Sequence, residues 1–362
     1  MRQRLLSILL LLVVSGPLPA QDILGFHPPE DVVPRLLSAR KPTLREDGSP
    51  VAYSWTLLHC SDLHGCTENL QRIVTFLDKY HSLIDVALHT GDSVKEWVED
   101  GNPWQEVKGA ESILNTVGNH DCRKRSGETS SPEETYRLLV APYVDTWQVV
   151  QPEGVNNPSG RHYAAGYYFK DFPVPAIRLV VLDGNRYTPE QHTWFESVLD
   201  DAREQGLRVV AVNHFSAQNG LIPIESGFSE RGVVIEPRED ASGQPLHRLD
   251  DGAYRLVDRF LDKGGTFICW LSGHEHQDFV GHVRDHGRQF QVTVDKSGWS
   301  DWFMEEDRTP GTPNQDSFNL LTVNVSRHLL ILDRIGSVRD QYLRGKHLFV
   351  YDYRNREVLV NE

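Results

Sequence analysis

Five apolar, β-type runs in this chain each end in a short polar segment that contains Asp, Asn or His. The runs span residues 55–60, 84–89, 112–117, 207–212 and 266–271. The segments that follow are Asp62-Leu63-His64, Gly91-Asp92, Gly118-Asn119-His120-Asp121, Asn213-His214 and Gly273-His274-Glu275-His276. In open α/β sheets, ligands collect outside the carboxyl ends of the strands. We therefore expect these side chains to meet at one sheet edge, although Asp62 and His64 alone could be polar residues that merely end a strand.

The candidate ligands supply hard oxygen and borderline nitrogen donors, and none is a thiolate. They are Asp62, His64, Asp92, Asn119, His214, His274 and His276. This mixture suits Mn, Fe or Zn better than Ca or Cu(I). Seven ligands are too many for one tetrahedral zinc, but they fit two metal ions if one carboxylate is shared. Glycines beside the ligands permit sharp turns and close backbone approach.

The remaining sequence predicts an α/β fold. Helices are expected after Thr67, after the capping-box sequence Ser131-Pro132-Glu133-Glu134 and after Thr188-Pro189-Glu190-Gln191. Further strands are expected at residues 176–182, 289–294, 318–325, 329–335 and 347–353. The first half therefore alternates strands with helices, and the last 70 or so residues are mainly β.

The five motifs, in this order, resemble those of the calcineurin-like metallophosphoesterase superfamily, over roughly residues 53–335. The resemblance implies a four-layer α/β/β/α sandwich, with two mixed sheets flanked by helices, and a binuclear metal centre of Mn, Fe or Zn. In this sequence it assigns one metal to Asp62, His64 and His276. It assigns the other metal to Asn119, His214 and His274, with Asp92 as the bridging ligand.

The same resemblance implies hydrolysis of a phosphate ester by attack of a metal-bridging hydroxide. His120 would bind the phosphate or protonate the leaving oxygen, and Asp121 would orient His120 or a metal ligand. The tyrosine ligand of purple acid phosphatases is missing, because Ser93-Val94-Lys95 follows the Gly-Asp motif. The Asp-Leu-His start is similar to the branch that hydrolyses cyclic nucleotides and glycerophosphodiesters. Together with the missing tyrosine it favours diesters or a broad specificity, and both diesters and monoesters remain open as substrates.

The amino terminus predicts export. Arg2 and Arg4 precede an apolar block at residues 5–14, and a cleavage-like Leu18-Pro19-Ala20 follows. The block is too short to span a bilayer, which needs about 20 residues. No Cys follows Ala20, so a lipoprotein attachment site is absent. We expect a signal peptide at 1–20, an irregular lead-in at 21–50, one domain at 51–338 and a packed C-terminal β tail at 339–362, in a secreted or periplasmic protein.

A formal net charge of −14 argues against a nucleic-acid partner, because such binding rests on Lys and Arg contacts to phosphates. A small phosphate ester held by metal ions is the expected substrate. The alternatives are a non-catalytic metal-binding surface module and a nuclease of the same fold. The oligomeric state is not predicted.

Several residues have a structural interpretation beside the functional one. His59 and His89 are expected in the core, and Asp183 is expected to cap a turn. The four cysteines could be free thiols, or one disulfide could join two of Cys60, Cys66 and Cys122. The long segments 141–165 and 215–250 are hypothesised to wall a substrate cleft, with disorder as the alternative. The aromatic cluster at 299–303 could pack in the core or contact the leaving group.

Overall fold

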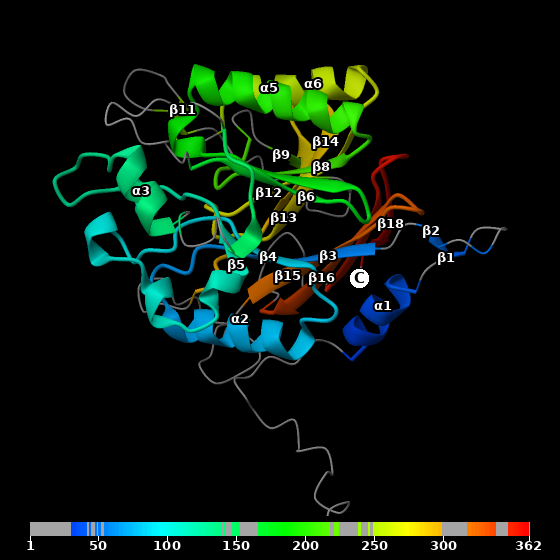
Figure 1. Cartoon of the computed structure of the whole chain (residues 1–362), viewed down its shortest axis with the longest axis horizontal. Helices are drawn as coiled ribbons and strands as arrows, with labels where there is room; N and C mark the ends of the chain where they lie inside the picture. Colours follow the sequence, from blue (N-terminus) through cyan, green and yellow to red (C-terminus); the bar gives the residue numbers. More distant parts are fainter. Residues whose placement is uncertain are drawn as a thin grey trace, which may run out of the picture.

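Two β-sheets face each other in the described part of the chain, and helices cover their outer faces (Figure 1). A computed structural model describes residues 30–41, 43–44, 48, 50–51, 54–139, 141, 146–152, 166–217, 221–223, 238–239, 245–246, 249–298, 317–337 and 347–361. The predicted signal peptide, the 299–303 cluster and most of the two long segments lie outside these ranges.

The first sheet has the strand order β6-β7-β8-β12-β14-β13-β9. Its strands are β6 (Tyr168–Phe172), β7 (Ile177–Val181), β8 (Arg208–Val212), β9 (Leu221–Pro223), β12 (Thr266–Ser272), β13 (Phe279–Val283) and β14 (His286–Thr293). Helices α5 (Pro189–Glu204) and α6 (Asp251–Asp262) lie on its outer face (Figure 1).

The second sheet has the order β18-β17-β16-β15-β3-β4-β5. Its strands are β3 (Ser54–Cys60), β4 (Val86–His89), β5 (Ile113–Asn115), β15 (Ser317–Asn324), β16 (Leu329–Gly336), β17 (Leu348–Asp352) and β18 (Glu357–Asn361). Helices α1 (Val32–Ala39) and α2 (Thr67–Tyr80) lie below it in Figure 1. The predicted α/β/β/α sandwich with two mixed sheets is therefore confirmed.

Short elements complete the described part. They are the paired strands β1 (Thr43–Leu44) and β2 (Pro50–Val51), the paired strands β10 (Arg238–Glu239) and β11 (Pro245–Leu246), helix α3 (Pro132–Leu139), and the 3₁₀ turns η1 (Val98–Asp100), η2 (Pro103–Glu106), η3 (Ala110–Ser112), η4 (His120–Cys122) and η5 (Gly184–Arg186). Every described helix is too short or too polar to cross a lipid bilayer.

Parallel pairing brings the motif-bearing strand ends together. β3, β4 and β5 are parallel neighbours, and so are β7, β8, β12 and β14. All seven residues of β3 are buried, as expected for a strand with a sheet neighbour on each side and layers on both faces. The expected strands are all present, but those at 84–89 and 112–117 are shorter than predicted. β4 begins only at Val86, and β5 ends at Asn115, where the chain turns into the motif loop.

The described hydrophobic core consists of two clusters, the first of which also includes side chains of α1 and α2. Apolar side chains from both sheets, such as Leu57 and Ile177, form the layer between the sheets. Phe195, Phe260 and Trp270 belong to a second cluster, which joins the first sheet to α5 and α6. Burial of each such large side chain stabilises the fold by roughly 1.5–3 kcal/mol. This packing therefore holds in place the sheet edge that carries the motifs.

Two of the three predicted helix starts are confirmed. The Gln191 N–H donates to Thr188 Oγ1 at 3.3 Å at the start of α5. The Glu134 N–H donates to Ser131 Oγ at 3.1 Å at the start of α3. The predicted Thr67 cap is wrong: Cys66 is the N-cap of α2, without a side-chain hydrogen bond. The Cys66 N–H donates to Leu63 O in a preceding turn, which sets the start of the helix.

The C-terminal strands extend the second sheet, since β17 pairs antiparallel with β16 and β18 pairs with β17. All four cysteines lie in the described residues and none forms a disulfide, so the disulfide alternative is wrong. Cys60 Sγ donates to the Leu88 carbonyl inside the second sheet, and burial raises the pKa of this thiol. Cys60 is therefore a structural residue of the core.

His286 joins α6 to β14, and its contacts with two carboxylates make the free energy of unfolding depend on pH. Its two ring nitrogens meet the carboxylates of Asp251 and Asp258, and Arg288 also pairs with Asp258. Burial opposes the His286 charge, but the two carboxylates outweigh it and raise its pKa. The stabilisation is thus fully present below about pH 6.5, the ordinary histidine pKa, and is lost as pH rises through the raised value.

We expect His286→Gln to lower the free energy of unfolding at pH 6 by about 2 kcal/mol. Urea denaturation at pH 6 and pH 9 checks this, and an equal loss at both would contradict it.

Candidate metal centre

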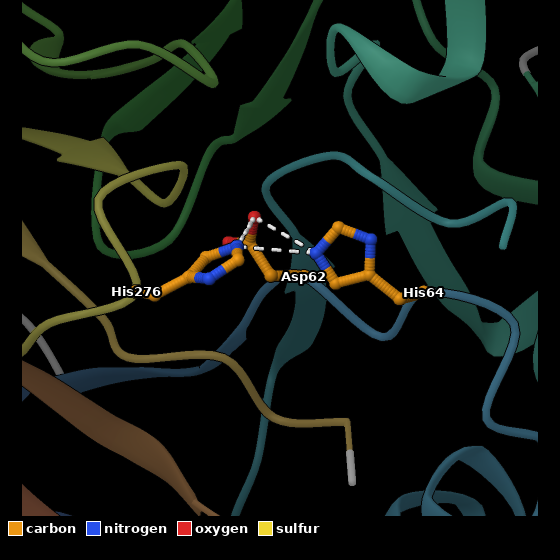
Figure 2. Close-up of side chains that lie close together, drawn as sticks. All are labelled: Asp62, His64 and His276. Carbon is orange, nitrogen blue, oxygen red and sulfur yellow. Dashed lines mark hydrogen bonds and ion pairs between the residues drawn. The ribbon is translucent and has the colours of Figure 1, made fainter. Parts of the chain in front are cut away.

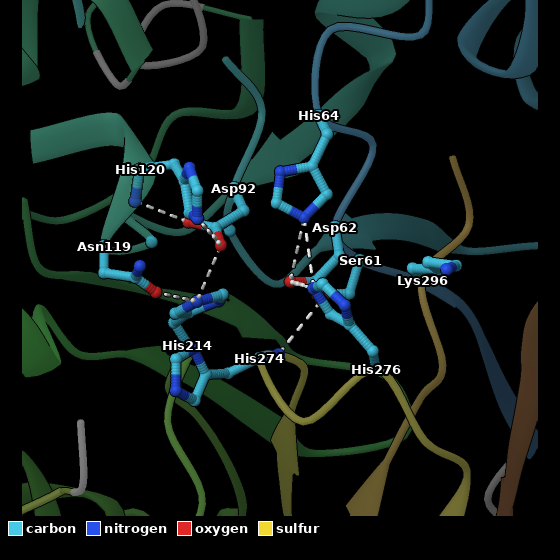
Figure 3. A network of polar contacts seen from close by, with 12 residues as sticks. Ser61, Asp62, His64, Asp92, Asn119, His120, His214, His274, His276 and Lys296 are labelled. Carbon is cyan, nitrogen blue, oxygen red and sulfur yellow. Dashed lines mark hydrogen bonds and ion pairs between the residues drawn. The ribbon is translucent and has the colours of Figure 1, made fainter. Parts of the chain in front are cut away.

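The structure brings all seven candidate ligands and His120 together at the carboxyl ends of the central strands (Figure 3). Asp62 and His64 follow β3, Asp92 follows β4, and Asn119 follows β5 of the second sheet. His214 follows β8, and His274 and His276 follow β12 of the first sheet. The side chains of both sheets therefore converge on one region between the layers.

Five of the seven candidates adopt left-handed backbone conformations. The φ angles are 51° at Asp62, 45° at His64, 59° at Asp92, 67° at His274 and 51° at His276. Such angles are uncommon for residues other than glycine and cost of order 1–3 kcal/mol each. Backbone hydrogen bonds hold this geometry, since the Asp62 N–H donates to Gly91 O and the His64 N–H to Asp92 O. Strain of this kind at several neighbouring positions is typical of a functional site.

The first group comprises Asp62, His64 and His276 (Figure 2). His276 Nε2 lies 3.3 Å from Asp62 Oδ1 and 3.1 Å from His64 Nε2. Asp62 Oδ1 is buried and accepts no hydrogen bond of ordinary geometry, whereas Oδ2 accepts the His274 N–H at 2.9 Å. A buried carboxylate oxygen that faces two imidazole nitrogens is the donor set a transition-metal ion would bind.

The second group comprises Asp92, His214 and His274, with Asn119 beside it. His214 Nε2 lies 3.3 Å from Asp92 Oδ2 and 3.0 Å from Asn119 Oδ1. The Thr90 carbonyl accepts a hydrogen bond from His214 Nδ1 at 2.7 Å. That bond leaves Nε2 as the nitrogen directed at the other donors, which is how outer-sphere partners fix a histidine ligand.

The two groups are linked through Asp92. Its carboxylate also lies in a cluster with His64 and His120, and Asp92 Oδ2 is 3.9 Å from His120 Nε2. Asp92 is thus the carboxylate positioned between the groups, as the bridging role requires. The donor set fits two cations that share one carboxylate.

The charges of the site are complementary before any cation binds. Burial lowers the pKa of His64 to about 4, so this ring is neutral at pH 7 and offers its lone pair. Burial opposes the charge on His214, but Asp92 outweighs it and raises the pKa to about 9. The Asp92 pKa falls well below its ordinary value, since His214 overcomes the cost of burial. His214 must therefore lose a proton when a metal binds.

Asp121 lies beneath the site. Its Oδ2 accepts the N–H groups of Asp92 and Gly118, at 2.9 and 2.8 Å. Its Oδ1 accepts the N–H groups of Ser93 and Val94, at 2.9 and 3.0 Å. Burial and the nearby Asp92 charge raise the Asp121 pKa to about 7, although the backbone donors favour its charged form. Asp121 is therefore placed to hold the Asp92 loop, and no described contact links its side chain to the His120 ring.

Two glycines allow the motif loops to approach each other. A Cβ on Gly118 would lie 2.2 Å from Asp92 Oδ1, and one on Gly273 would lie 1.8 Å from Ser61 Oγ. Real Cβ atoms do not approach this closely. Gly118 and Gly273 are therefore required for the position of the carboxylates.

The segment after β14 also supports the site, although no motif in the sequence marks it. The Ser297 N–H donates to Ser61 O, and the Gly298 N–H donates to Asp62 O at 3.3 Å, so this segment supports the Asp-Leu-His loop. Lys296 is buried beside His276 (Figure 3). Burial and the Lys296 charge oppose protonation of that ring, but Asp62 outweighs them and raises the His276 pKa. The available signal was that residues 289–294 form a strand ending at the same sheet edge.

The structural interpretations of three other residues are confirmed. His59 and His89 are fully buried, and burial lowers their pKa values to about 3 and 4. One ring nitrogen of each has a partner, Thr90 Oγ1 for His59 and Asn115 Oδ1 for His89. Asp183 Oδ1 accepts the Asn185 N–H at 3.1 Å and so caps η5.

A cavity of about 370 Å³ adjoins the second group. It is lined by Asn119, Cys122, Arg123, Thr129 and Asn185. The Arg123 guanidinium also stacks on the Trp97 ring, 5.1 Å from its centroid. The candidate ligand Asn119 therefore shares this cavity with the hydrogen-bond donor Asn185 and the cation Arg123.

A family model and a solved structure agree with the family and the fold that the sequence predicts. A family model described as calcineurin-like phosphoesterase matches residues 56–278. A dimetal phosphatase from Danio rerio has a similar structure, with 11% identity, 78% of this chain and 96% of that chain covered, and a TM-score of 0.50. A purple acid phosphatase from yellow lupin (Lupinus luteus) seeds has 14% identity, 85% and 56% coverage, and a TM-score of 0.45. No curated protein sequence matches the chain.

Proposed function

This chain belongs to the calcineurin-like phosphoesterase family, and on that premise we propose that it hydrolyses a small phosphate ester at a binuclear metal centre. Family membership makes it a metal-dependent hydrolase of phosphoric esters. The proposal adds the two cations, their ligands and the catalytic residues. We assign Asp62, His64 and His276 to one cation, and Asn119, His214 and His274 to the other, with Asp92 shared.

The position of Asp92 is the observation that carries the proposal. Its carboxylate faces His214 on one side and the His64–His120 pair on the other (Figure 3). Two cations, when bound, would polarise the phosphoryl oxygens and lower the pKa of a water molecule. Asp92 would hold both at the short separation that this chemistry needs.

His120 is the proposed proton donor to the leaving oxygen. Its backbone N–H donates to Asp92 Oδ1 at 2.8 Å, and its ring packs edge-on against His64 at 4.8 Å. These contacts fix a partly exposed imidazole next to the cation site without making it one of the assigned ligands. Histidine transfers protons near neutral pH, so this position suits a general acid.

The cavity beside Asn119 is the proposed place for the alcohol portion of the substrate. Arg123 and Asn185 line it, and both can donate hydrogen bonds. We also propose that residues 1–20 direct export and that residues 51–338 form the catalytic domain, as the sequence predicts.

The test compares bis(p-nitrophenyl) phosphate with p-nitrophenyl phosphate, using protein stripped by chelator and reloaded with Mn, Fe or Zn. Metal-dependent release of p-nitrophenolate is the expected result. The ratio of kcat/KM for the two substrates separates diesterase from monoesterase, and the activity with each ion identifies the preferred metal. Two bound metals without turnover of either substrate would instead favour a non-catalytic metal-binding module. Salt-sensitive binding and cleavage of DNA would favour a nuclease.

A further inference from the structure

A second cavity, of about 390 Å³, lies at the opposite end of the central strands. Arg208 and Thr266 line it, and they are the first residues of β8 and β12. The same two strands lead to His214 and His274 at their other ends. At about 3.3 Å per residue, the seven-residue β12 separates the cavity from the metal centre by roughly 20 Å.

The cavity concentrates positive charge in a chain whose formal net charge is −14. Besides Thr266, its polar lining residues are Arg208, Arg288, His328, Tyr353, Arg354 and Arg356. Arg288 is neutralised by Asp262, at 2.8 Å, and by Asp258. In the described ranges, no carboxylate pairs with Arg208, Arg354 or Arg356. The nearby Asp352 carboxylate is engaged by the N–H groups of its own turn.

The other polar groups in the lining lie beside these arginines and can form hydrogen bonds. His328 Nε2 lies 3.3 Å from Arg354 Nη1, and burial together with Arg354 and Arg208 lowers the His328 pKa. The buried Tyr353 hydroxyl makes no hydrogen bond of ordinary geometry, although Arg208 lies beside it. A ligand with many acceptor oxygens and several negative charges would satisfy these groups together.

Two tight turns supply much of this lining. The turn after β15 ends at His328, with φ 59°, and the turn after β17 ends at Arg356, with φ 63°. Glycine or asparagine is preferred at left-handed turn positions, because other side chains are strained there. Local backbone preference therefore does not explain why both turns place a cavity-lining histidine or arginine at this point.

We propose that this cavity binds a small ligand with two or more linked phosphoryl groups. One phosphate carries about −1.5 to −2 at pH 7, which is too little to balance three uncompensated guanidinium groups. Arginine forms bidentate hydrogen bonds with phosphate oxygens, so these residues suit a phosphoryl chain in chemistry as well as in charge. The volume lies in the range of small-molecule sites, about 300–1,000 Å³. The chain could belong to inorganic polyphosphate or to a nucleotide.

Calorimetric titration of the metal-free protein tests the proposal, because the metal centre then cannot hold the anion. Tripolyphosphate is expected to bind with one molecule per chain and at least tenfold more tightly than inorganic phosphate. Arg354→Gln and Arg356→Gln are each expected to raise its Kd by about tenfold, the cost of one charge-assisted hydrogen-bond partner. Titration with ATP identifies the source: tighter binding than tripolyphosphate indicates a nucleotide, and equal binding indicates the phosphoryl chain alone.

Arg255→Gln is the matched control. It removes the same charge from an exposed arginine that pairs with Asp251 on α6 at 2.6 Å. Its Kd for tripolyphosphate should change by less than twofold. An equal loss in this variant, equal affinity for inorganic phosphate, or no binding by the unmodified protein would each overturn the proposal. Turnover of p-nitrophenyl phosphate by the metal-loaded variants verifies that they are folded.

Discussion

Asp92→Asn is expected to lower metal content and to reduce phosphoesterase activity by more than about a hundredfold. Loss of an outer-sphere partner costs up to about a hundredfold, and Asp92 is assigned as a direct ligand. Asparagine preserves the shape of the side chain and can still accept the His120 N–H through Oδ1. It removes the negative charge that lies 3.3 Å from His214 Nε2. The variant thus separates the proposed bridging charge from the hydrogen bond.

Asp183→Asn is the matched control for this experiment. Asp183 is also buried at a strand end, but it caps η5 and lies 3.5 Å from Arg186. Metal content is measured by elemental analysis after dialysis, and activity by release of p-nitrophenolate. Full metal occupancy and activity in Asp92→Asn would remove Asp92 from the metal centre. A similar metal loss in Asp183→Asn would show that the first loss reflects general damage to this sheet edge.

The sequence predicted the fold and the convergence of the site because its signals are strong and local. Strand patterns such as 55–60 and 266–271 are followed at once by Asp-x-His or Gly-His-x-His, and parallel pairing brings such strand ends together. The cap at Thr188 was readable because Pro189 and Gln191 follow it. Strand ends, ligand motifs and helix caps of this kind are each encoded within a few residues, so their prediction requires no tertiary information.

The remaining features depend on contacts between distant segments. The left-handed conformation of Asp62 and His64 follows from hydrogen bonds to the Gly91–Asp92 backbone, which no local pattern reveals. The Asp121 carboxylate was expected to orient His120 or a ligand, and its backbone partners across the loop became visible only in the fold. The arginine-lined cavity brings Arg208 together with turn residues such as His328 and Arg356, which follow it by more than 100 positions in the sequence. No local sequence pattern therefore indicates this cavity.

The leaving-group dependence of His120→Gln is the sharpest test of the catalytic assignment. Glutamine keeps a polar side chain at a position that is 19% exposed, but it cannot transfer a proton. Metal content should therefore remain that of the unmodified protein, because the His120 side chain is not one of the assigned ligands.

An aliphatic alkoxide needs a proton as it leaves, whereas p-nitrophenolate is a stable anion. We therefore expect His120→Gln to reduce kcat by about 10²–10⁴ for an alkyl phosphate and much less for a p-nitrophenyl ester. Steady-state kinetics on the two substrates, with metal content measured in the same samples, makes the comparison internal to one variant. An equal reduction for both would assign His120 to binding the phosphoryl group, because that contact does not depend on the leaving group. Unchanged kcat for the alkyl ester would exclude His120 as the general acid.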